Sequence, residues 1–231
     1  MARIIEIFSS IQGEGIYLGQ SHLFIRFWDC NMACRYCDTE YKGPYQEYTV
    51  EMLMAEVRNR LDREGPFDAV SLTGGEPLLW TDFLLKFLPE LKALGVKTYL
   101  ETNGTLPEAL EAVSPWMDII AMDWKPPTAT GDLPQWTRHE AFLRIALRSD
   151  AKTFIKLILT AGTSQADYHE ALDRIARIST DIPLVLQPVT PHGPVKTSPS
   201  PDQLTAWQTE ALKRFSSVQI LPQIHKILGV P

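Results

Sequence analysis

The chain has 231 residues, 45% of them hydrophobic and 22% charged, with a formal net charge of −6. This length fits one domain with a full core, and the composition is typical of a soluble globular protein. The acidic charge disfavours nucleic-acid binding, and no apolar run is long enough to span a membrane. Because only three cysteines and no apolar leader are present, we expect a cytoplasmic protein without disulfides.

Apolar runs rich in β-branched residues alternate with stretches of helical period almost to the end of the chain. Strands are predicted at residues 22–28, 69–73, 97–101, 118–123, 153–160, 183–187 and 217–221. Helices are predicted at residues 50–62, 82–94, 106–113, 138–148, 165–178 and 201–214. Thr49 and Ser164 are expected N-caps and Gly95 a helix stop, with loops at 126–134 and 188–201. This alternation predicts an α/β fold with a parallel sheet, most simply a partial TIM-like barrel; a flavodoxin-like open sheet is the alternative.

All three cysteines lie close together, at Cys30, Cys34 and Cys37. Thiolates are soft ligands that suit iron–sulfur clusters, and a [4Fe–4S] cluster takes four ligands. Without a fourth cysteine, one iron would stay open to bind a small molecule. A zinc site would need another ligand, and the nearest histidine in sequence is His22. The spacing therefore favours a cluster over zinc.

The cysteine spacing, in a loop after a predicted strand, resembles the signature of the radical S-adenosylmethionine (SAM) superfamily. In that superfamily SAM binds the open iron through its amino and carboxylate groups. The segment Thr73-Gly74-Gly75-Glu76 resembles the Gly-Gly-Glu motif that holds the SAM amino group, although alone it could be a turn. The resemblance implies SAM contacts in the cysteine loop, the Gly-Gly-Glu motif and the next two strand ends: Tyr36, Cys37, Asp38, Gly75, Glu76, Glu101, Asn103, Asp123, Trp124 and Lys125. The Asp123-Trp124 pair departs from the Ser-Pro often found there.

The N-terminal segment places an amide and a carboxylate among glycines, at Gln12 and Glu14. Side chains of these types can pair with the amide and amino edge of a pterin. Arg26 lies within a predicted strand, where an unpaired arginine is costly. It could bind the carboxylate of an acidic substrate bidentately, or form an ion pair with Asp29 or Glu14. The residues alone leave both interpretations open.

Taken together, these segments, the Cys-Asp-Thr sequence at 37–39 and the ending Leu221–Lys226 resemble the 7-carboxy-7-deazaguanine synthase (QueE) family. The resemblance implies a carbon–nitrogen lyase that contracts 6-carboxy-5,6,7,8-tetrahydropterin to 7-carboxy-7-deazaguanine with loss of ammonia. The cluster and the radical formed from SAM would perform the chemistry, so no catalytic side chain is expected. Mg²⁺ would assist, held by the substrate and Thr39; otherwise Thr39 is a turn residue.

The resemblance further implies one radical SAM domain over residues 1–231. An N-terminal segment would bind the pterin, and a C-terminal extension would close its pocket. The implied substrate contacts come from both ends and from strand ends: Ile11, Gln12, Gly13, Glu14, Arg26, Thr73, Gln187, His225 and the terminal carboxylate of Pro231. A homodimer and a flavodoxin-type electron donor are family expectations.

Two other functions compete with this one. A glycyl-radical-enzyme activating enzyme shares the cysteine spacing but would not need Gln12, Glu14 or Arg26. A binding module with a structural metal site leaves the Gly-Gly-Glu motif without a role. The sequence leaves open the physiological reductant, the oligomeric state and the later fate of the product.

Overall fold

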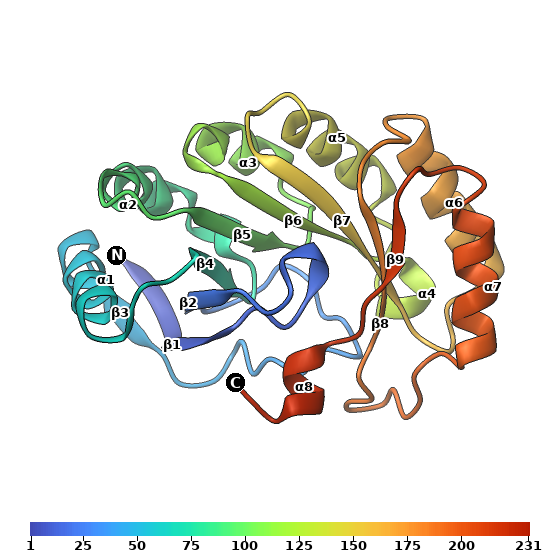
Figure 1. Ribbon diagram of the computed structural model, residues 1–231, viewed down its shortest axis with the longest axis horizontal. Helices are drawn as coiled ribbons and strands as arrows, with labels where there is room; N and C mark the ends of the chain where they lie inside the picture. The colour runs from blue at the N-terminus through green and yellow to red at the C-terminus, as the bar shows by residue number, and fades with distance from the viewer.

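The apolar runs of the chain pair into one sheet of nine strands, described over residues 1–231 in a computed structural model (Figure 1). The strands are β1 (Ala2–Ile11), β2 (Ser21–Phe27), β3 (Gln46–Tyr48), β4 (Ala69–Gly74), β5 (Thr98–Thr102), β6 (Ile119–Trp124), β7 (Lys152–Leu159), β8 (Leu184–Pro188) and β9 (Val218–Ile220). Their order is β3-β1-β2-β4-β5-β6-β7-β8-β9. β1 pairs antiparallel with β2 and β3, and all other pairs are parallel. The sheet stays open between β3 and β9, so the predicted partial barrel is confirmed.

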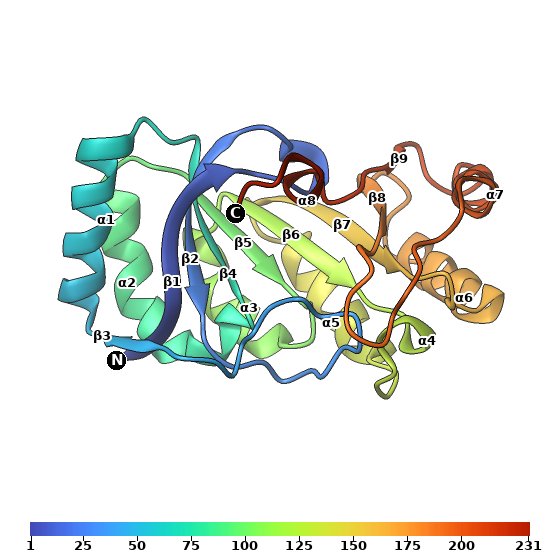
Figure 2. The same cartoon turned by 90° about the horizontal axis from the view of Figure 1, so that it is seen from below.

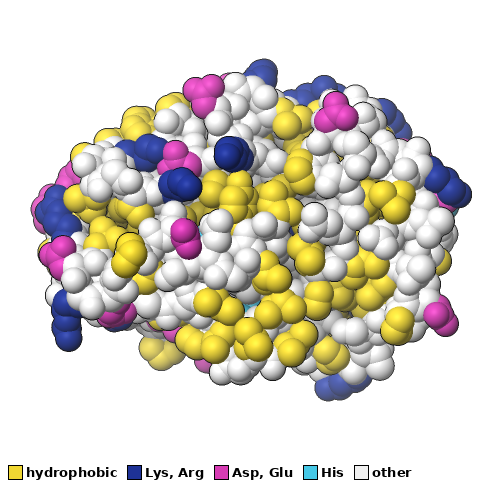
Figure 3. Space-filling view, viewed as in Figure 1, with side chains coloured by type: hydrophobic (Ala, Val, Ile, Leu, Met, Phe, Trp, Pro, Cys, Tyr) yellow, Lys and Arg dark blue, Asp and Glu magenta, His cyan; other side chains and the backbone are white.

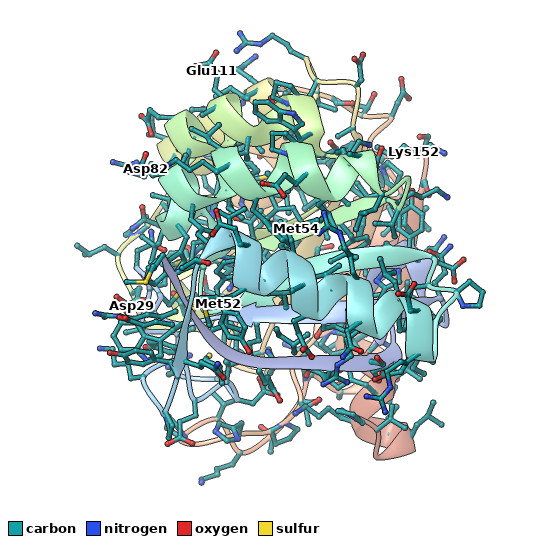
Figure 4. The ribbon with its side chains drawn as sticks, turned by 90° about the vertical axis from the view of Figure 1, so that its left-hand side faces the viewer. Asp29, Met52, Met54, Asp82, Glu111 and Lys152 are labelled. Carbon is teal, nitrogen blue, oxygen red and sulfur yellow. The ribbon has the colours of Figure 1, made fainter.

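A row of helices covers the outer face of the curved sheet, while α8 lies on its inner side (Figures 1 and 2). The helices are α1 (Val50–Glu64), α2 (Thr81–Ala93), α3 (Pro107–Val113), α4 (Pro127–Thr130), α5 (Trp136–Ala146), α6 (Gln165–Ala176), α7 (Pro201–Ala211) and α8 (Ile224–Leu228). The amphipathic pattern of α1 sets its orientation, since Met54 is fully buried whereas Met52 is 45% exposed (Figure 4). No helix is both long and apolar enough to cross a membrane.

The two faces of the sheet bury different side chains. Forty residues form the main core between the sheet and its outer helices. On the inner face a smaller apolar cluster sits toward the amino ends of the parallel strands: Ala69, Tyr99, Ile119, Ala121, Phe154 and Val185. Because strand side chains alternate with period two, the next inward residues after Tyr99, Ala121, Phe154 and Val185 fall nearer the carboxyl ends. Those positions carry polar groups, so the inner face changes from apolar to charged along the strands.

The predicted elements agree with the structure except at the two ends of the chain and in two loops. The expected N-caps are present, since the Thr49 hydroxyl accepts from Met52 N and the Ser164 hydroxyl from Asp167 N. The prediction omitted β1, which was interpreted only as a substrate-binding segment although its residues also pair with β2. It also omitted β3, α4 within the loop at 126–134, and α8. All three elements are short, and β3 pairs with β1, from the start of the chain.

Hydrophobic side chains gather on the lower part of the face shown in Figure 3, the region where α8 lies in Figure 1. Ile227 and Leu228 on α8 are 69% and 59% exposed. Helix α8 therefore lays only part of its surface on the sheet, and hydrogen bonds at both of its ends hold it there.

Packing of the main core should dominate the stability of the sheet. Leu157 on β7 is fully buried in that core, so Leu157→Ala should lower the free energy of unfolding by about 2–5 kcal/mol. Leu133 is 81% exposed, and Leu133→Ala should change it by less than about 0.5 kcal/mol. Urea unfolding of the cluster-free protein measures both. Equal effects at the two sites would contradict the described packing.

Candidate functional site

A cleft of about 590 Å³ lies at the carboxyl ends of the inner strands. Parallel strands place ligands at these ends, which explains its position. Its walls come from the N-terminal segment, the cysteine loop, the strand ends and the C-terminal tail. The predicted site residues that line it are Ile11, Gln12, Gly13, Glu14, Arg26, Cys30, Cys34, Tyr36, Cys37, Asp38, Thr39, Thr73, Gly75, Glu101, Asn103, Asp123, Lys125, Gln187, His225 and Pro231. The side chains of Glu76 and Trp124 do not line it.

The cysteine loop is held against the Gly-Gly turn by backbone contacts. Asp29 has a φ of 69°, a left-handed conformation that Asp adopts more readily than most residues. Its carbonyl accepts from Glu76 N at 2.8 Å, and its side chain accepts from Cys30 N at 2.8 Å. A Cβ on Gly75 would lie 1.7 Å from the Asp29 carbonyl oxygen. Only glycine therefore fits at position 75.

The three thiols share the floor of the cleft with a partly buried cation. Burial raises the pKa of Cys30 to about 11 and also raises the pKa of Cys34, while the ammonium of Lys125 opposes both shifts. All three thiols line the same cavity. A cubane cluster takes each thiolate at a different iron and can leave its fourth iron to a small molecule, so three cysteines suit a cluster better than a four-ligand zinc site. The nearby Tyr36 hydroxyl is buried without a hydrogen-bond partner.

Glu76 connects two loops instead of facing the cleft. It is fully buried, and its carboxylate accepts from Leu78 N at 3.1 Å, the Thr102 hydroxyl at 2.9 Å and Asn103 N at 2.8 Å. Burial raises its pKa to about 7, against the opposing effect of these hydrogen bonds. The sequence predicted that this carboxylate would receive the ammonium of a ligand. In the structure the carboxylate instead holds the loop after β5 in place.

That loop reaches the cysteines through Asn103. The Asn103 amide donates to Asn31 Oδ1 at 2.8 Å and lies 3.8 Å from Cys30 Sγ. Its backbone carbonyl contacts His139 Nε2 at 3.0 Å. Burial lowers the pKa of His139 to about 4, so the ring is neutral at pH 7. The loop is therefore fixed from both sides.

Asp123 and Lys125 face the cleft, whereas Trp124 faces the main core. The side chains alternate along the end of β6, and the Lys125 ammonium lies 3.2 Å from Asp123 Oδ2. The Trp124 ring is fully buried and stacks with Trp136 at 6.4 Å between centroids. A role of Trp124 in the cleft is limited to its backbone.

Arg26 forms an ion pair with a residue that the sequence interpretation did not consider. Its Nε donates to Glu6 Oε1 at 2.6 Å, across the antiparallel pair of β1 and β2. A second guanidinium nitrogen lies 3.5 Å from the Thr39 hydroxyl. The proposed partners Asp29 and Glu14 are engaged elsewhere. The rest of the guanidinium lines the cleft and remains able to bind an anion.

A buried polar network joins the N-terminal turn to the strand ends. Gln12 donates to Glu101 Oε1 at 2.8 Å, and its side-chain oxygen accepts from Glu14 N at 2.9 Å. The other oxygen of Glu101 accepts from the Thr73 hydroxyl at 2.8 Å. Gln12 thus fixes the conformation of the turn, and Glu14 is the carboxylate of this turn that lines the cleft.

The sequence analysis missed Lys156, which is 3% exposed and sits on β7. Its ammonium lies 2.6 Å from Glu14 Oε2 and 3.0 Å from Asp123 Oδ1. Burial works against the ionised forms, but Lys156 lowers the pKa of Glu14 to about 2. The signal for Lys156 was present, because a lysine inside the apolar run at 153–160 needs a buried partner.

The C-terminal tail closes the cleft over the N-terminal segment. Ile224 N donates to the Gly13 carbonyl at 2.9 Å, and the Ser10 hydroxyl donates to an oxygen of Pro231 at 2.7 Å. Lys226 forms an ion pair with Asp38 at 2.7 Å. The tail is therefore tied to β1 and to the cysteine loop.

Comparison with known proteins identifies the family to which this cleft belongs. A 7-carboxy-7-deazaguanine synthase of Geobacter sulfurreducens is 37% identical over 99% of this chain and 97% of its own length. One from Methanothermobacter thermautotrophicus is 32% identical over 99% and 98%. This chain belongs to the 7-carboxy-7-deazaguanine synthase family. The profile of the Radical SAM superfamily matches residues 28–125, which implies a [4Fe–4S] cluster and SAM for this synthase-family chain.

The fold agrees with that membership. The crystal structure of QueE from Escherichia coli has a TM-score of 0.60 to this structure at 21% sequence identity. The match covers 95% of this chain and 94% of that one. The E. coli structure therefore shares this fold over nearly the whole chain. The alternative of a glycyl-radical-enzyme activating enzyme is not favoured by these relatives.

The buried carboxyl of Glu76 should make stability depend on pH. With a folded pKa near 7 against 4.5 when unfolded, the native state binds more protons, so this stabilisation is lost as pH rises. Between pH 5 and pH 8 the wild type should lose about 2–3 kcal/mol of unfolding free energy relative to Glu76→Gln. Urea titrations of both proteins at the two pH values measure this difference. A difference that stays constant with pH would contradict the assignment.

The contact between Gly13 and the tail gives a local prediction. A Cβ at Gly13 would lie 2.2 Å from His225 Nδ1, so Gly13→Ala should displace α8. If the contact weakens by about 1.4 kcal/mol, trypsin should cleave after Lys226 about tenfold faster. Gly162→Ala is the control, because its Cβ would meet no atom closer than 3.6 Å. Unchanged cleavage in Gly13→Ala would show that the tail does not depend on this contact.

Proposed function

We propose that this chain converts 6-carboxy-5,6,7,8-tetrahydropterin to 7-carboxy-7-deazaguanine with loss of ammonia, within deazapurine (queuosine) biosynthesis. The observation that carries the proposal is one cleft with two chemically distinct halves. The cysteine loop and the ends of β4–β6 form one half. Arg26, Glu14 and the C-terminal tail form the other. Substrate and SAM would meet between them.

Cys30, Cys34 and Cys37 would hold the [4Fe–4S] cluster, and their common cavity supports this assignment. When bound, the reduced cluster and SAM supply the 5′-deoxyadenosyl radical that takes hydrogen from the substrate. The backbone of Gly75 and the loop at Asn103, fixed by Glu76, would position SAM beside the cysteines. Tyr36, Asp38, Glu101, Asp123, Trp124 (by its backbone) and Lys125 would complete its surroundings.

The pterin half is proposed from its hydrogen-bonding groups. Glu14 stays ionised at neutral pH, so its carboxylate would accept N–H donors of the pterin edge. Ile11, Gln12 and Gly13 shape the turn that presents it, and Thr73 and Gln187 complete that surface. The buried Gln187 Oε1 has no partner and is available to a bound molecule. His225 and the Pro231 carboxylate would close the pocket.

Arg26 would bind the carboxylate of the substrate. Its ion pair with Glu6 fixes the guanidinium, so fewer side-chain rotations are lost on binding. Thr39 lies beside it and would contribute its hydroxyl to a Mg²⁺ that the substrate also ligates. A single hydroxyl is consistent with a cation that keeps most of its ligands as water and substrate oxygens.

The remaining proposals concern the domain organisation, the location, the oligomeric state and the electron donor of the protein. We propose one radical SAM domain over residues 1–231, acting in the cytoplasm as a homodimer. A flavodoxin-type donor would reduce the cluster. The exposed apolar side chains Ile227 and Leu228 give one surface where a second subunit could pack.

The proposal is tested with anaerobically reconstituted protein, dithionite, SAM and the carboxylated tetrahydropterin. We expect 7-carboxy-7-deazaguanine and ammonia in equal amounts, with SAM regenerated. Cys34→Ala should lose the cluster absorbance and all product, because no other cysteine can replace the ligand. Normal cluster loading and SAM cleavage without pterin turnover in the wild type would reject this function.

Arg26→Lys keeps the charge but loses the planar fork that fits a carboxylate. Misplacement of the substrate by about 1 Å should lower pterin turnover roughly a hundredfold. SAM cleavage without substrate should stay near the wild-type rate. Arg3→Lys is the matched control, since Arg3 also lies on the sheet but stacks on Trp28 outside the cleft. Wild-type turnover by Arg26→Lys, or equal losses in both reactions, would leave Arg26 a structural residue.

A further inference from the structure

Lys156 is the only lysine or arginine of β7–β9 that lines the cleft, and the proposed function gives it no role. Its strand position follows from period-two alternation, because Phe154 and Ile158 face the same side of β7. An ammonium has three N–H donors. The ammonium donates to Glu14 Oε2 at 2.6 Å and forms an ion pair with Asp123 Oδ1 at 3.0 Å.

The charges around Lys156 come from each element packed against it. Glu14 follows β1, Glu101 and Tyr99 lie on β5, and Asp123 lies on β6. The amides of Gln187 on β8 and Gln223 near the tail also face Glu14. Burial lowers the pKa of Lys156, but the neighbouring carboxylates outweigh it and raise the pKa well above its usual value. The ammonium is therefore a permanent charge.

We propose that Lys156 is a positioning residue that holds the Glu14 carboxylate in its pterin-binding place and links it to Asp123 on the SAM side of the cleft. The inference rests on the proposed function, in which Glu14 binds the pterin. Glu14 and Asp123 contact the same ammonium although they lie 109 positions apart in the sequence. Removing Lys156 leaves Glu14 with the neutral amides of Gln223 and Gln187, and leaves Asp123 with Lys125.

Because only Asp123 keeps a cation, the loss of Lys156 should affect the pterin half of the cleft more than the SAM half. Without Lys156 the partly buried Glu14 carboxylate is stabilised only by neutral donors, so protonation becomes easier. A protonated Glu14 accepts fewer N–H donors from the ligand. Asp123 keeps a cation at 3.2 Å, so SAM binding should change little. Pterin binding should weaken and should recover as the pH rises.

The experiment measures binding of the carboxylated tetrahydropterin to cluster-loaded protein with SAM and without reductant, by anaerobic calorimetry from pH 6 to pH 8.5. In the wild type the dissociation constant should be flat with pH. In Lys156→Met it should rise at least about tenfold at pH 6 and approach the wild-type value at pH 8.5. Lys156→Arg keeps the charge and should restore a flat profile.

Lys152→Met is the matched control. Lys152 begins the same strand, is exposed, and lies at the end of the molecule away from Asp29 and the cysteine loop (Figure 4). The Lys152→Met protein should bind pterin and SAM as the wild type does. The dissociation constant of SAM alone should change less than about threefold in Lys156→Met.

A double-mutant cycle covers the case in which Lys156→Met is poorly folded. If Lys156 acts through Glu14, adding Lys156→Met to Glu14→Gln should weaken pterin binding far less than it does in the wild type. Additive losses, a flat pH profile in Lys156→Met, or equal weakening of SAM and pterin would overturn the inference. Failure of the wild type to bind pterin while it binds SAM would instead reject the proposed function.

Discussion

The cleft depends on one close backbone contact, between Asp29 after β2 and Gly75 after β4. β2 and β4 are parallel neighbours, so their carboxyl ends already meet. The left-handed Asp29 turns its carbonyl onto the Gly-Gly turn, where it accepts from Glu76 N. Every thiol follows within eight residues of Asp29. The position of the cysteine loop is therefore set by hydrogen bonds of the sheet edge before any ligand binds.

The rest of the cleft follows from the change in character along the inner face of the sheet. Each inner strand places an apolar residue deep in the barrel and a polar one two positions later, as Phe154 precedes Lys156 on β7. Buried charges are costly unless paired, so these polar groups form ion pairs and hydrogen bonds with one another. The network fixes their directions, which is the property a site for positioning a radical's target requires.

Local signals in the sequence predicted most of this arrangement, and long-range pairings account for the misses. The cysteine spacing, the glycines and the strand ends are readable within a few residues, and their side chains do meet in one cleft. Whether Arg26 pairs with Glu6 depends on the register of β1 with β2, which the sequence analysis did not assign as a pair. Glu76 was expected to face a ligand, but its carboxylate accepts three hydrogen bonds from the protein and points away from the cleft. Lys156 has partners on elements far away in sequence.

The match to the Radical SAM superfamily ends at residue 125, and this boundary has a physical meaning. Within residues 28–125 lie the thiols, the Gly-Gly turn and the Asp123–Lys125 pair, which together make the half of the cleft assigned to cluster and SAM. Glu14, Lys156 and the tail lie outside it. The superfamily segment thus carries the thiols and the Gly-Gly turn, and the rest of the cleft comes from residues before and after that segment. The ion pair of Lys156 with Asp123 crosses that boundary, so one ammonium connects a carboxylate of the superfamily segment with Glu14 of the N-terminal turn.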